Sequence, residues 1–277
     1  MEKLKRKINI RLILLIVIAL LLIIFLLYML YIKISVKEIY SIDSRVDKIK
    51  EEKKKDNSIY YKTIGWLRVQ GTNIDTPIIG YDDDKIEKDN KYNLTVDKKN
   101  YLWNEINSEK LYNKVNIMGH NILNLSREPD IGLKQFSRFD DLMAFVYYDF
   151  IKDNKYIQYT IDGKDYIYQI FSVNFDYQEN LDLYTYGNYS KKNMKKYIDK
   201  VRKNSIYDFN VKVNDSDNII SLITCTRMYG ADDQKEFIVN AKMVKNDKKL
   251  YNYKVSKNNN YKKIEKMLKG DVEDEKA

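Results

Sequence analysis

The sequence predicts a mainly β domain, built as a closed or nearly closed barrel, behind a single membrane-spanning helix near the N-terminus. Two observations support this fold class. The segment Leu12 to Ile32 is apolar and carries no charge. The rest of the chain contains several short apolar runs with the period of a strand and few helical patterns. Many short strands are typical of barrels, in which closure removes exposed sheet edges.

Composition limits the chemistry that the chain can perform. The 277 residues, 44% hydrophobic and 32% charged, are enough for one globular domain with a sizeable core. One cysteine and one histidine exclude a disulfide framework, Cys-rich zinc modules and multi-His metal sites. Any reaction that needs a thiol must therefore use Cys225, and any that needs an imidazole must use His120.

The net charge of +9 is compatible with nucleic acid, an anionic membrane surface or an acidic polymer as a partner. Lysine is abundant along the whole chain, so this charge reflects a general compositional bias. The run Asp82-Asp83-Asp84 lacks the ligand spacing of a calcium-binding loop and is interpreted as a solvated loop. We therefore predict no metal and no cofactor.

The apolar segment from Leu12 to Ile32 is long enough to cross a bilayer, since a helix rises ~1.5 Å per residue and spans about 30 Å here. Signal peptides usually have an apolar region of ~7–15 residues, followed by a small-residue cleavage site that this sequence lacks. We therefore expect an uncleaved anchor. Basic residues between Lys3 and Arg11 place the N-terminus in the cytoplasm, so the domain faces outward. This orientation argues against an intracellular nucleic-acid role.

The segment that follows the anchor has apolar residues at helical spacing from Val36 to Ile49 and charges up to Lys55. It is either a juxtamembrane helix packed on the domain or a solvated stalk. The predicted organisation is a cytoplasmic N-terminus, a transmembrane helix, a juxtamembrane helix or linker, a barrel domain, and a charged, mobile C-terminal tail, at residues 1–11, 12–32, 33–58, 59–246 and 247–277.

Short apolar segments separated by turn residues define the predicted strands. Asp162-Gly163 is a typical hairpin turn between two of them. Ser190 is an N-cap candidate for an amphipathic helix that extends to about Asn204, and a short helix is predicted over Tyr261–Leu268. The predicted strands are Ile64–Val69, Ile74–Ile79, Val115–Met118, Tyr156–Ile161, Tyr166–Val173, Ile219–Thr224 and Phe237–Val244.

Cys225 ends one of these strands, between two threonines. Taken alone, a single cysteine at a strand end is most often a small buried apolar residue. In a domain outside the cell, however, a free thiol is prone to oxidation and no disulfide accounts for it. Arg227 lies two residues further on, and a nearby cation favours the reactive thiolate. Cys225 is therefore a candidate nucleophile.

His120 also ends a predicted strand, directly after Gly119. A lone histidine is by default structural, but a Cys/His pair can perform acyl transfer through thiolate attack on a carbonyl and protonation of the leaving amine. Such a reaction needs a group that stabilises the developing oxyanion. Arg227, Lys235 and the backbone amides near Cys225 are the candidates.

Several sequence motifs resemble those of sortases, most closely class B. Leu222-Ile223-Thr224-Cys225 resembles the family's cysteine motif, with an intact Thr224-Cys225, and Met118-Gly119-His120-Asn121 resembles its histidine motif with Met in place of Tyr. The segments Gly65-Trp66-Leu67 and Gly71 to Ile78 resemble the family's opening strands, and the helix over 191–204 resembles the class B helix between the sixth and seventh strands. The resemblance covers roughly Ile64 to Val244 and keeps these motifs in the family's order.

The resemblance implies a sortase-like closed barrel of about eight strands with a few peripheral helices. It also implies a cysteine transpeptidase without a cofactor. Cys225 would attack a carbonyl in the C-terminal sorting signal of a secreted protein and form a thioacyl intermediate, and His120 would protonate the leaving amine. A peptidoglycan-precursor or cross-bridge amine would then resolve the intermediate. Thr224 and Asn121 are the candidate substrate-binding residues, and the implied location is the outer membrane face of a Gram-positive type envelope.

The sequence departs from the family at one functional position. Sortases carry an arginine on the strand after the cysteine, but counting along this sequence reaches Lys235 or Glu236 instead. We therefore assign the cationic role to Arg227, with Lys235 as the alternative. Lysine supplies charge without the planar fork of a guanidinium. Two other functions stay open, a non-catalytic wall- or partner-binding module on the same barrel and a hydrolytic cysteine peptidase.

Overall fold

The structure is a computed structural model, and it divides into an N-terminal helix and a barrel domain. The segment Asp82-Asp83-Asp84 lies outside the described residues. The residues described are 10–40, 44–56, 61–81, 102–104, 108–126, 128–132, 139–177, 179–180, 187–230, 235–244 and 253–270.

Helix α1 (Ile10–Tyr40) contains the apolar segment predicted from the sequence. Its stretch Ile13–Tyr31 has a mean hydropathy of 3.5, and its side chains are exposed in the isolated chain. By length and composition this stretch is sufficient to cross a membrane. The helix extends beyond the predicted span of 12–32 at both ends, from Ile10 to Tyr40.

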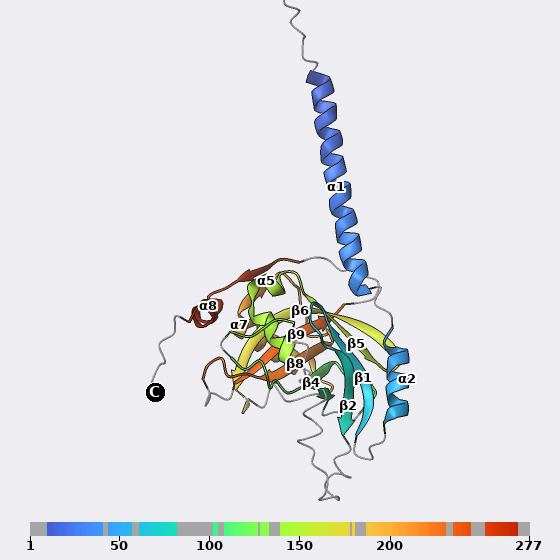
Figure 1. Cartoon of the computed structure of the whole chain (residues 1–277), viewed down its shortest axis with the longest axis vertical. Coiled ribbons are helices and arrows are strands. Elements are labelled where there is room, and N and C mark those ends of the chain that lie inside the picture. Colours follow the sequence, from blue (N-terminus) through green and yellow to red (C-terminus); the bar gives the residue numbers. More distant parts are fainter. Residues whose placement is uncertain are drawn as a thin grey trace, which may run out of the picture. The chain divides into compact units, whose positions relative to one another are not determined.

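Eight strands form a closed barrel in the order β1-β2-β3-β4-β8-β9-β6-β5, as the sequence predicts (Figure 1). Pairing of β1 with β5 closes the barrel, with Leu67 opposite Tyr159. The β2–β3 and β4–β8 pairs are parallel, and the other pairs are antiparallel. The strands of the barrel are Tyr61–Val69 (β1), Asp75–Tyr81 (β2), Leu102–Asn104 (β3), Lys114–Met118 (β4), Tyr156–Ile161 (β5), Lys164–Tyr177 (β6), Ile219–Cys225 (β8) and Lys235–Met243 (β9).

The β5–β6 hairpin confirms the turn prediction. Asp162 and Gly163 both have positive φ, at 54° and 66°. This backbone conformation matches the twist of a two-residue hairpin loop and is accessible to Asp and Gly at low cost. Between β4 and β5 the chain forms the 3₁₀ helix η1 (Asp140–Val146), which is fully buried, and the short helix α5 (Tyr148–Ile151).

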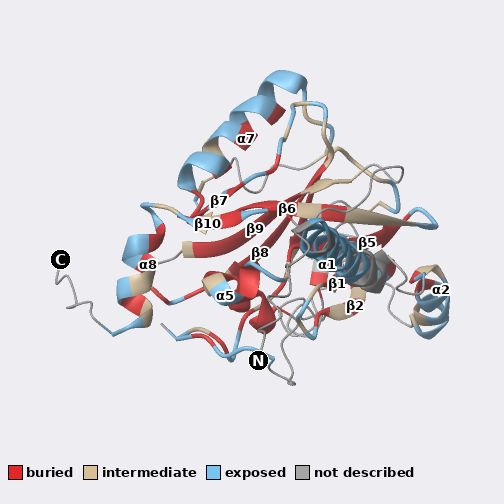
Figure 2. Ribbon diagram, turned by 90° about the horizontal axis from the view of Figure 1, so that it is seen from above, coloured by how far each residue is buried: buried red, intermediate tan, exposed pale blue. Residues whose placement is uncertain are grey.

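Helix α7 (Lys191–Asn204) packs on the barrel through one apolar face, while its opposite face is exposed (Figure 2). Its start is capped as predicted, because the Ser190 hydroxyl accepts a hydrogen bond from the Asn193 amide at 3.2 Å. The buried side chains repeat at helical spacing and are Met194, Tyr197, Ile198 and Val201.

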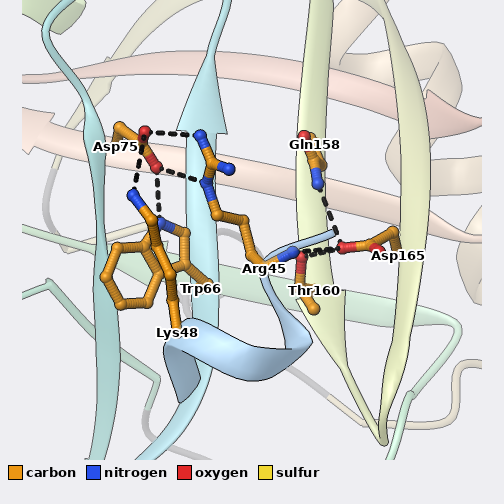
Figure 3. A network of polar contacts seen from close by, with 7 residues as sticks. All are labelled: Arg45, Lys48, Trp66, Asp75, Gln158, Thr160 and Asp165. Atoms are coloured by element: carbon orange, nitrogen blue, oxygen red, sulfur yellow. Dashed lines mark hydrogen bonds and ion pairs between the residues drawn. The ribbon is translucent and has the colours of Figure 1, made fainter. Parts of the chain in front are cut away.

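Helix α2 (Val46–Lys55) lies against the barrel wall, which corresponds to the packed alternative rather than the solvated stalk (Figure 3). The Arg45 guanidinium makes a bidentate contact with the Asp75 carboxylate, in which Nε donates to Oδ1 at 2.9 Å and Nη2 donates to Oδ2 at 2.7 Å. The Trp66 indole also donates to Asp75, at 2.6 Å. The Arg45 backbone amide donates to Asp165 at 3.2 Å, so one residue joins α2 to both β2 and β6.

The C-terminal segment differs from the expected mobile tail. Strand β10 (Val255–Lys257) pairs with β7 (Tyr207–Phe209), and helix α8 spans Tyr261–Leu268, as the sequence predicts for the helix. Strand β10 was not predicted, because a three-residue strand in a Lys- and Asn-rich segment has no pattern of its own. The buried residues of α8 are Tyr261, Ile264 and Met267.

Candidate active site

The parallel pairing of β4 with β8 brings the cysteine and histidine motifs to the same edge of the barrel. Their last paired residues are Met118 and Ile223, so His120 and Cys225 each follow two positions later. The Gly119 amide extends this pairing by donating to the Ile223 carbonyl at 3.2 Å. Because the carboxyl ends of neighbouring parallel strands meet, the two motifs emerge side by side.

Gly119 is required by close packing at this edge. A Cβ atom at Gly119 would lie 2.5 Å from Leu102 and 2.9 Å from Phe139, closer than side-chain atoms approach one another. Both neighbours are fully buried. A glycine therefore allows the chain to pass between β3 and the segment before η1 and to deliver His120 beside β8.

The two side chains predicted to bind substrate form hydrogen bonds within the protein. The buried Thr224 hydroxyl donates to the Gly119 carbonyl at 2.7 Å. The Asn121 amide group donates to the Cys225 carbonyl at 3.1 Å and to the Asn124 carbonyl at 2.9 Å. These contacts join the histidine motif to the cysteine motif on both sides of His120.

Cys225 is half-buried, and its Sγ donates to the Asn121 carbonyl at 3.5 Å. Burial raises the pKa of the thiol, and the Glu236 carboxylate raises it further. The charge of Arg227 lowers this pKa without cancelling the rise. The protonated thiol is therefore the resting form at neutral pH.

Strand β9 places Glu236 directly opposite Cys225 in the antiparallel ladder. Lys235 and Glu236 are the two positions that counting offers for the family's arginine, and the ladder places Glu236, not Lys235, opposite Cys225. Lys235 is one residue earlier, and its ammonium lies over the rings of Tyr229 and Tyr177, at 3.7 and 4.7 Å from their centroids. The Lys235 ammonium thus makes cation–π contacts with both tyrosine rings.

Arg227 follows Cys225 on the loop after β8 and is exposed. Its charge acts on the thiol and lowers the thiol pKa, as noted above. His120 is half-buried, and its carbonyl accepts from the Phe139 amide at 3.4 Å. The predicted cationic residue therefore interacts electrostatically with the predicted nucleophile, whereas Lys235 contacts tyrosine rings.

Two further buried residues near His120 were not predicted from the sequence. Asn124 and Asp140 are each 1% exposed and hold the loop after His120 through side-chain hydrogen bonds. Asparagine and aspartate occur throughout this chain, so only the folded arrangement distinguishes these two. Within the described part of the chain, no group of three His, Cys, Asp or Glu side chains is placed to hold a metal ion.

Comparison with known proteins finds a relative in sequence and solved structures with a similar fold. No family model matches the sequence. Sortase B of Listeria monocytogenes is 30% identical over 172 residues, which are 58% of this chain and 62% of that protein. The matching region thus spans less than two thirds of the length of this relative.

Solved structures share the barrel architecture. A sortase B complexed with triglycine has a TM-score of 0.55 and 18% identity, with 76% of this chain and 93% of that chain covered. A Staphylococcus aureus sortase B–substrate complex has a TM-score of 0.53 and 17% identity, with coverage of 76% and 90%. At these identities the solved structures establish the fold. The chain is similar in sequence to a sortase B over part of its length and has a sortase B-like fold.

Proposed function

We propose that this chain is a membrane-anchored cysteine transpeptidase of the sortase type. The observation that carries the proposal is the parallel β4–β8 pairing, which brings the only thiol and the only imidazole of the sequence to neighbouring strand ends. The sortase B relative supports the same chemistry. Cys225 is the nucleophile and His120 is the acid–base residue in this proposal.

The proposed reaction begins with a proton transfer, since the resting thiol is neutral. The Cys225 proton moves to His120, and the thiolate attacks the carbonyl carbon of the scissile peptide bond. The tetrahedral adduct collapses when the imidazolium donates its proton to the leaving amine. The products are a thioester on Cys225, the released C-terminal peptide with a free amine, and a neutral imidazole.

An acceptor amine then resolves the thioester. Its nitrogen attacks the acyl carbon, the sulfur leaves, and His120 accepts a proton from the amine and returns one to the thiolate. A new amide bond forms and the free thiol is restored. When water replaces the amine, the same steps give hydrolysis, so transpeptidation depends on an amine that competes well with water.

Arg227 is the proposed oxyanion or substrate-positioning group. Its guanidinium is exposed on the loop beside Cys225, and its charge favours negative charge on the sulfur. A guanidinium can donate two parallel hydrogen bonds to a carbonyl oxygen and a neighbouring acceptor. Lys235 remains the alternative, and its position over Tyr229 and Tyr177 makes it the weaker one.

The proposed substrates are secreted proteins with a C-terminal sorting signal and an amine of peptidoglycan or its precursor. Structural neighbours described as a substrate complex and as a complex with triglycine support this substrate class. The apolar segment Ile13–Tyr31 supports an anchored enzyme with its N-terminus in the cytoplasm. Such an anchor would keep the barrel at the membrane face where both substrates arrive.

Peptide cleavage tests this proposal. The full chain is incubated with a fluorogenic library of sorting-signal peptides, with and without added triglycine, and the products are identified by mass spectrometry. We expect cleavage that triglycine diverts to an amide product, and loss of cleavage in Cys225→Ala and His120→Ala. Undiminished cleavage in Cys225→Ala refutes the assignment. A product that contains only hydrolysed peptide at high triglycine indicates a peptidase.

One observation favours a second function, a non-catalytic wall- or partner-binding module. Glu236 occupies the ladder position opposite Cys225 and raises the pKa of the thiol. A thiol titration separates the two functions. A catalytic Cys225 reacts with iodoacetamide in the folded protein, whereas a purely structural thiol reacts only after denaturation.

A further inference from the structure

The backbone on both sides of His120 is fixed to the strand that carries Cys225. Before His120, the Gly119 amide donates to Ile223 at 3.2 Å and its carbonyl accepts from Thr224 at 2.7 Å. After His120, the Asn121 side chain donates to the Cys225 carbonyl at 3.1 Å. His120 therefore cannot shift relative to Cys225 unless several of these bonds break.

Asn121 is held in turn by Asn124. The Asn121 carboxamide donates to the Asn124 carbonyl at 2.9 Å, and its oxygen accepts from the Asn124 amide at 3.0 Å. With the bond to Cys225, these contacts use both the donor and the acceptor of a side chain that is only 3% exposed. A buried amide with satisfied partners has one orientation, so hydrogen bonds fix the position of the Asn121 side chain.

Asp140 and Asn124 extend this arrangement into η1. The Asp140 carboxylate accepts from the amides of Ile122 and Leu123 at 2.7 and 3.1 Å. The Asn124 side chain donates to the carbonyls of Asp140 and Asp130, both at 2.9 Å. The loop after His120 is therefore tied to a fully buried 3₁₀ helix.

We propose that Asn121, Asn124 and Asp140 form a positioning network that sets the separation between the His120 imidazole and the Cys225 sulfur. Asn121 acts in this network and not as a substrate-binding residue. Effective proton transfer depends on sub-ångström placement, and a shift of ~1 Å can cost about 100-fold in rate. The kinetic part of this inference rests on the proposed transpeptidase function, whereas the structural part does not.

The principal variant is Asn121→Ala in the full chain. We expect kcat for peptide cleavage to fall ~10–100-fold while KM changes less than about twofold, because geometry and not binding is lost. Asn113→Ala is the matched control. Asn113 also makes two hydrogen bonds to backbone, with Tyr189, but it lies at the opposite end of β4. The control is expected to keep kcat. A rise in KM alone for Asn121→Ala would instead indicate that Asn121 binds the substrate.

A readout that does not need turnover keeps the inference separate from the proposed function. The chain has one histidine, so ¹⁵N-histidine labelling gives the imidazole signals of His120 alone. We expect methylthiolation of Cys225 to shift these signals in the wild type and to shift them by less than half as much in Asn121→Ala. Equal shifts, together with unchanged kcat, overturn the network. Shifts as expected without any peptide turnover refute the proposed function and leave the network standing.

A second pair of variants applies if Asn121→Ala does not fold. Asp140→Asn keeps an oxygen acceptor for the amides of Ile122 and Leu123, whereas Asp140→Ala removes it. We expect Asp140→Asn to retain at least about half of the imidazole shift and of kcat, and Asp140→Ala to lose most of both. Equal behaviour of the two variants, at wild-type level, would contradict a positioning role for this carboxylate.

Discussion

Glu236 lies directly across the β8–β9 ladder from Cys225, so a buried carboxylate neighbours the thiol at one of the two positions where the family resemblance predicts an arginine. Opposed residues in an antiparallel pair share one face of the sheet. A negative charge therefore lies beside the proposed nucleophile and raises the pKa of the thiol.

Glu236→Gln is expected to lower the pKa of Cys225. Burial is the largest cause of the raised thiol pKa and stays, but the repulsion between carboxylate and thiolate is removed. The rate of iodoacetamide alkylation at pH 7 should rise severalfold, and the midpoint of its pH profile should move to lower pH. Glu51→Gln, an exposed carboxylate on α2, is the control that should leave the profile unchanged. An unchanged midpoint in Glu236→Gln would show that this carboxylate does not act on the thiol.

Arg227→Ala is expected to have the opposite effect on the thiol, since the charge of Arg227 lowers its pKa. If this guanidinium also holds the oxyanion, kcat/KM should fall ~100–1,000-fold, the usual effect of removing one such donor. Lys235→Ala should cost much less, because its ammonium is directed to tyrosine rings. Steady-state kinetics of both variants decide the matter, and a larger loss in Lys235→Ala would transfer the role to Lys235.

Lys114 makes the stability of the barrel depend on pH. This first residue of β4 is fully buried, and its ammonium donates to Asn116 and Ser221 and lies 4.5 Å from the ring centroid of Tyr197 on α7. Burial lowers the pKa of Lys114 to about 7, from 10.5 for a free lysine. Between these values the unfolded chain binds more protons, so stability should rise with pH by up to ~1.4 kcal/mol per unit.

Urea unfolding at several pH values between 6 and 10 tests this dependence. Lys114→Met should abolish the rise of stability with pH, whereas Lys191→Met, at an exposed position on α7, should retain it. A Lys114→Met protein with the wild-type slope would mean that another group is responsible.

The Arg45–Asp75 pair is expected to hold α2 on the barrel. Burial acts to raise the pKa of Asp75, but hydrogen bonds from Arg45 and Trp66 and the charge of Arg45 outweigh it and lower this pKa. Asp75→Asn should cost about 1–2 kcal/mol of unfolding free energy at pH 7, after allowance for partial solvent screening. Because the folded pKa is lowered, this difference should vanish as acid protonates Asp75. A difference that persists at low pH would point to packing rather than charge.

The sequence is informative where local chemistry sets the structure. The Asp162-Gly163 turn, the Ser190 cap and the apolar run of β8 each carry their own pattern, and all three are present as predicted. Three-residue strands such as β3 and β7 have no such pattern, since their pairing partners determine them.

The candidate site was predictable only in part. Cys225 and His120 stand out because each is unique in the chain. The choice between Lys235 and Glu236 could not be made by counting, and only the ladder register places Glu236 opposite the thiol. Asn124 and Asp140 could not be identified from the sequence, because their hydrogen bonds join segments that only folding brings together.

Trapping of the acyl-enzyme is the most direct test of the account. The full chain is incubated with a sorting-signal peptide that it cleaves, without an acceptor amine, then quenched in acid and analysed by intact-mass and peptide-mapping mass spectrometry. We predict an acyl adduct on the peptide that contains Cys225, removed by hydroxylamine and absent in Cys225→Ala. Cleavage of the peptide with no adduct on Cys225, and at an equal rate in Cys225→Ala, would contradict the account.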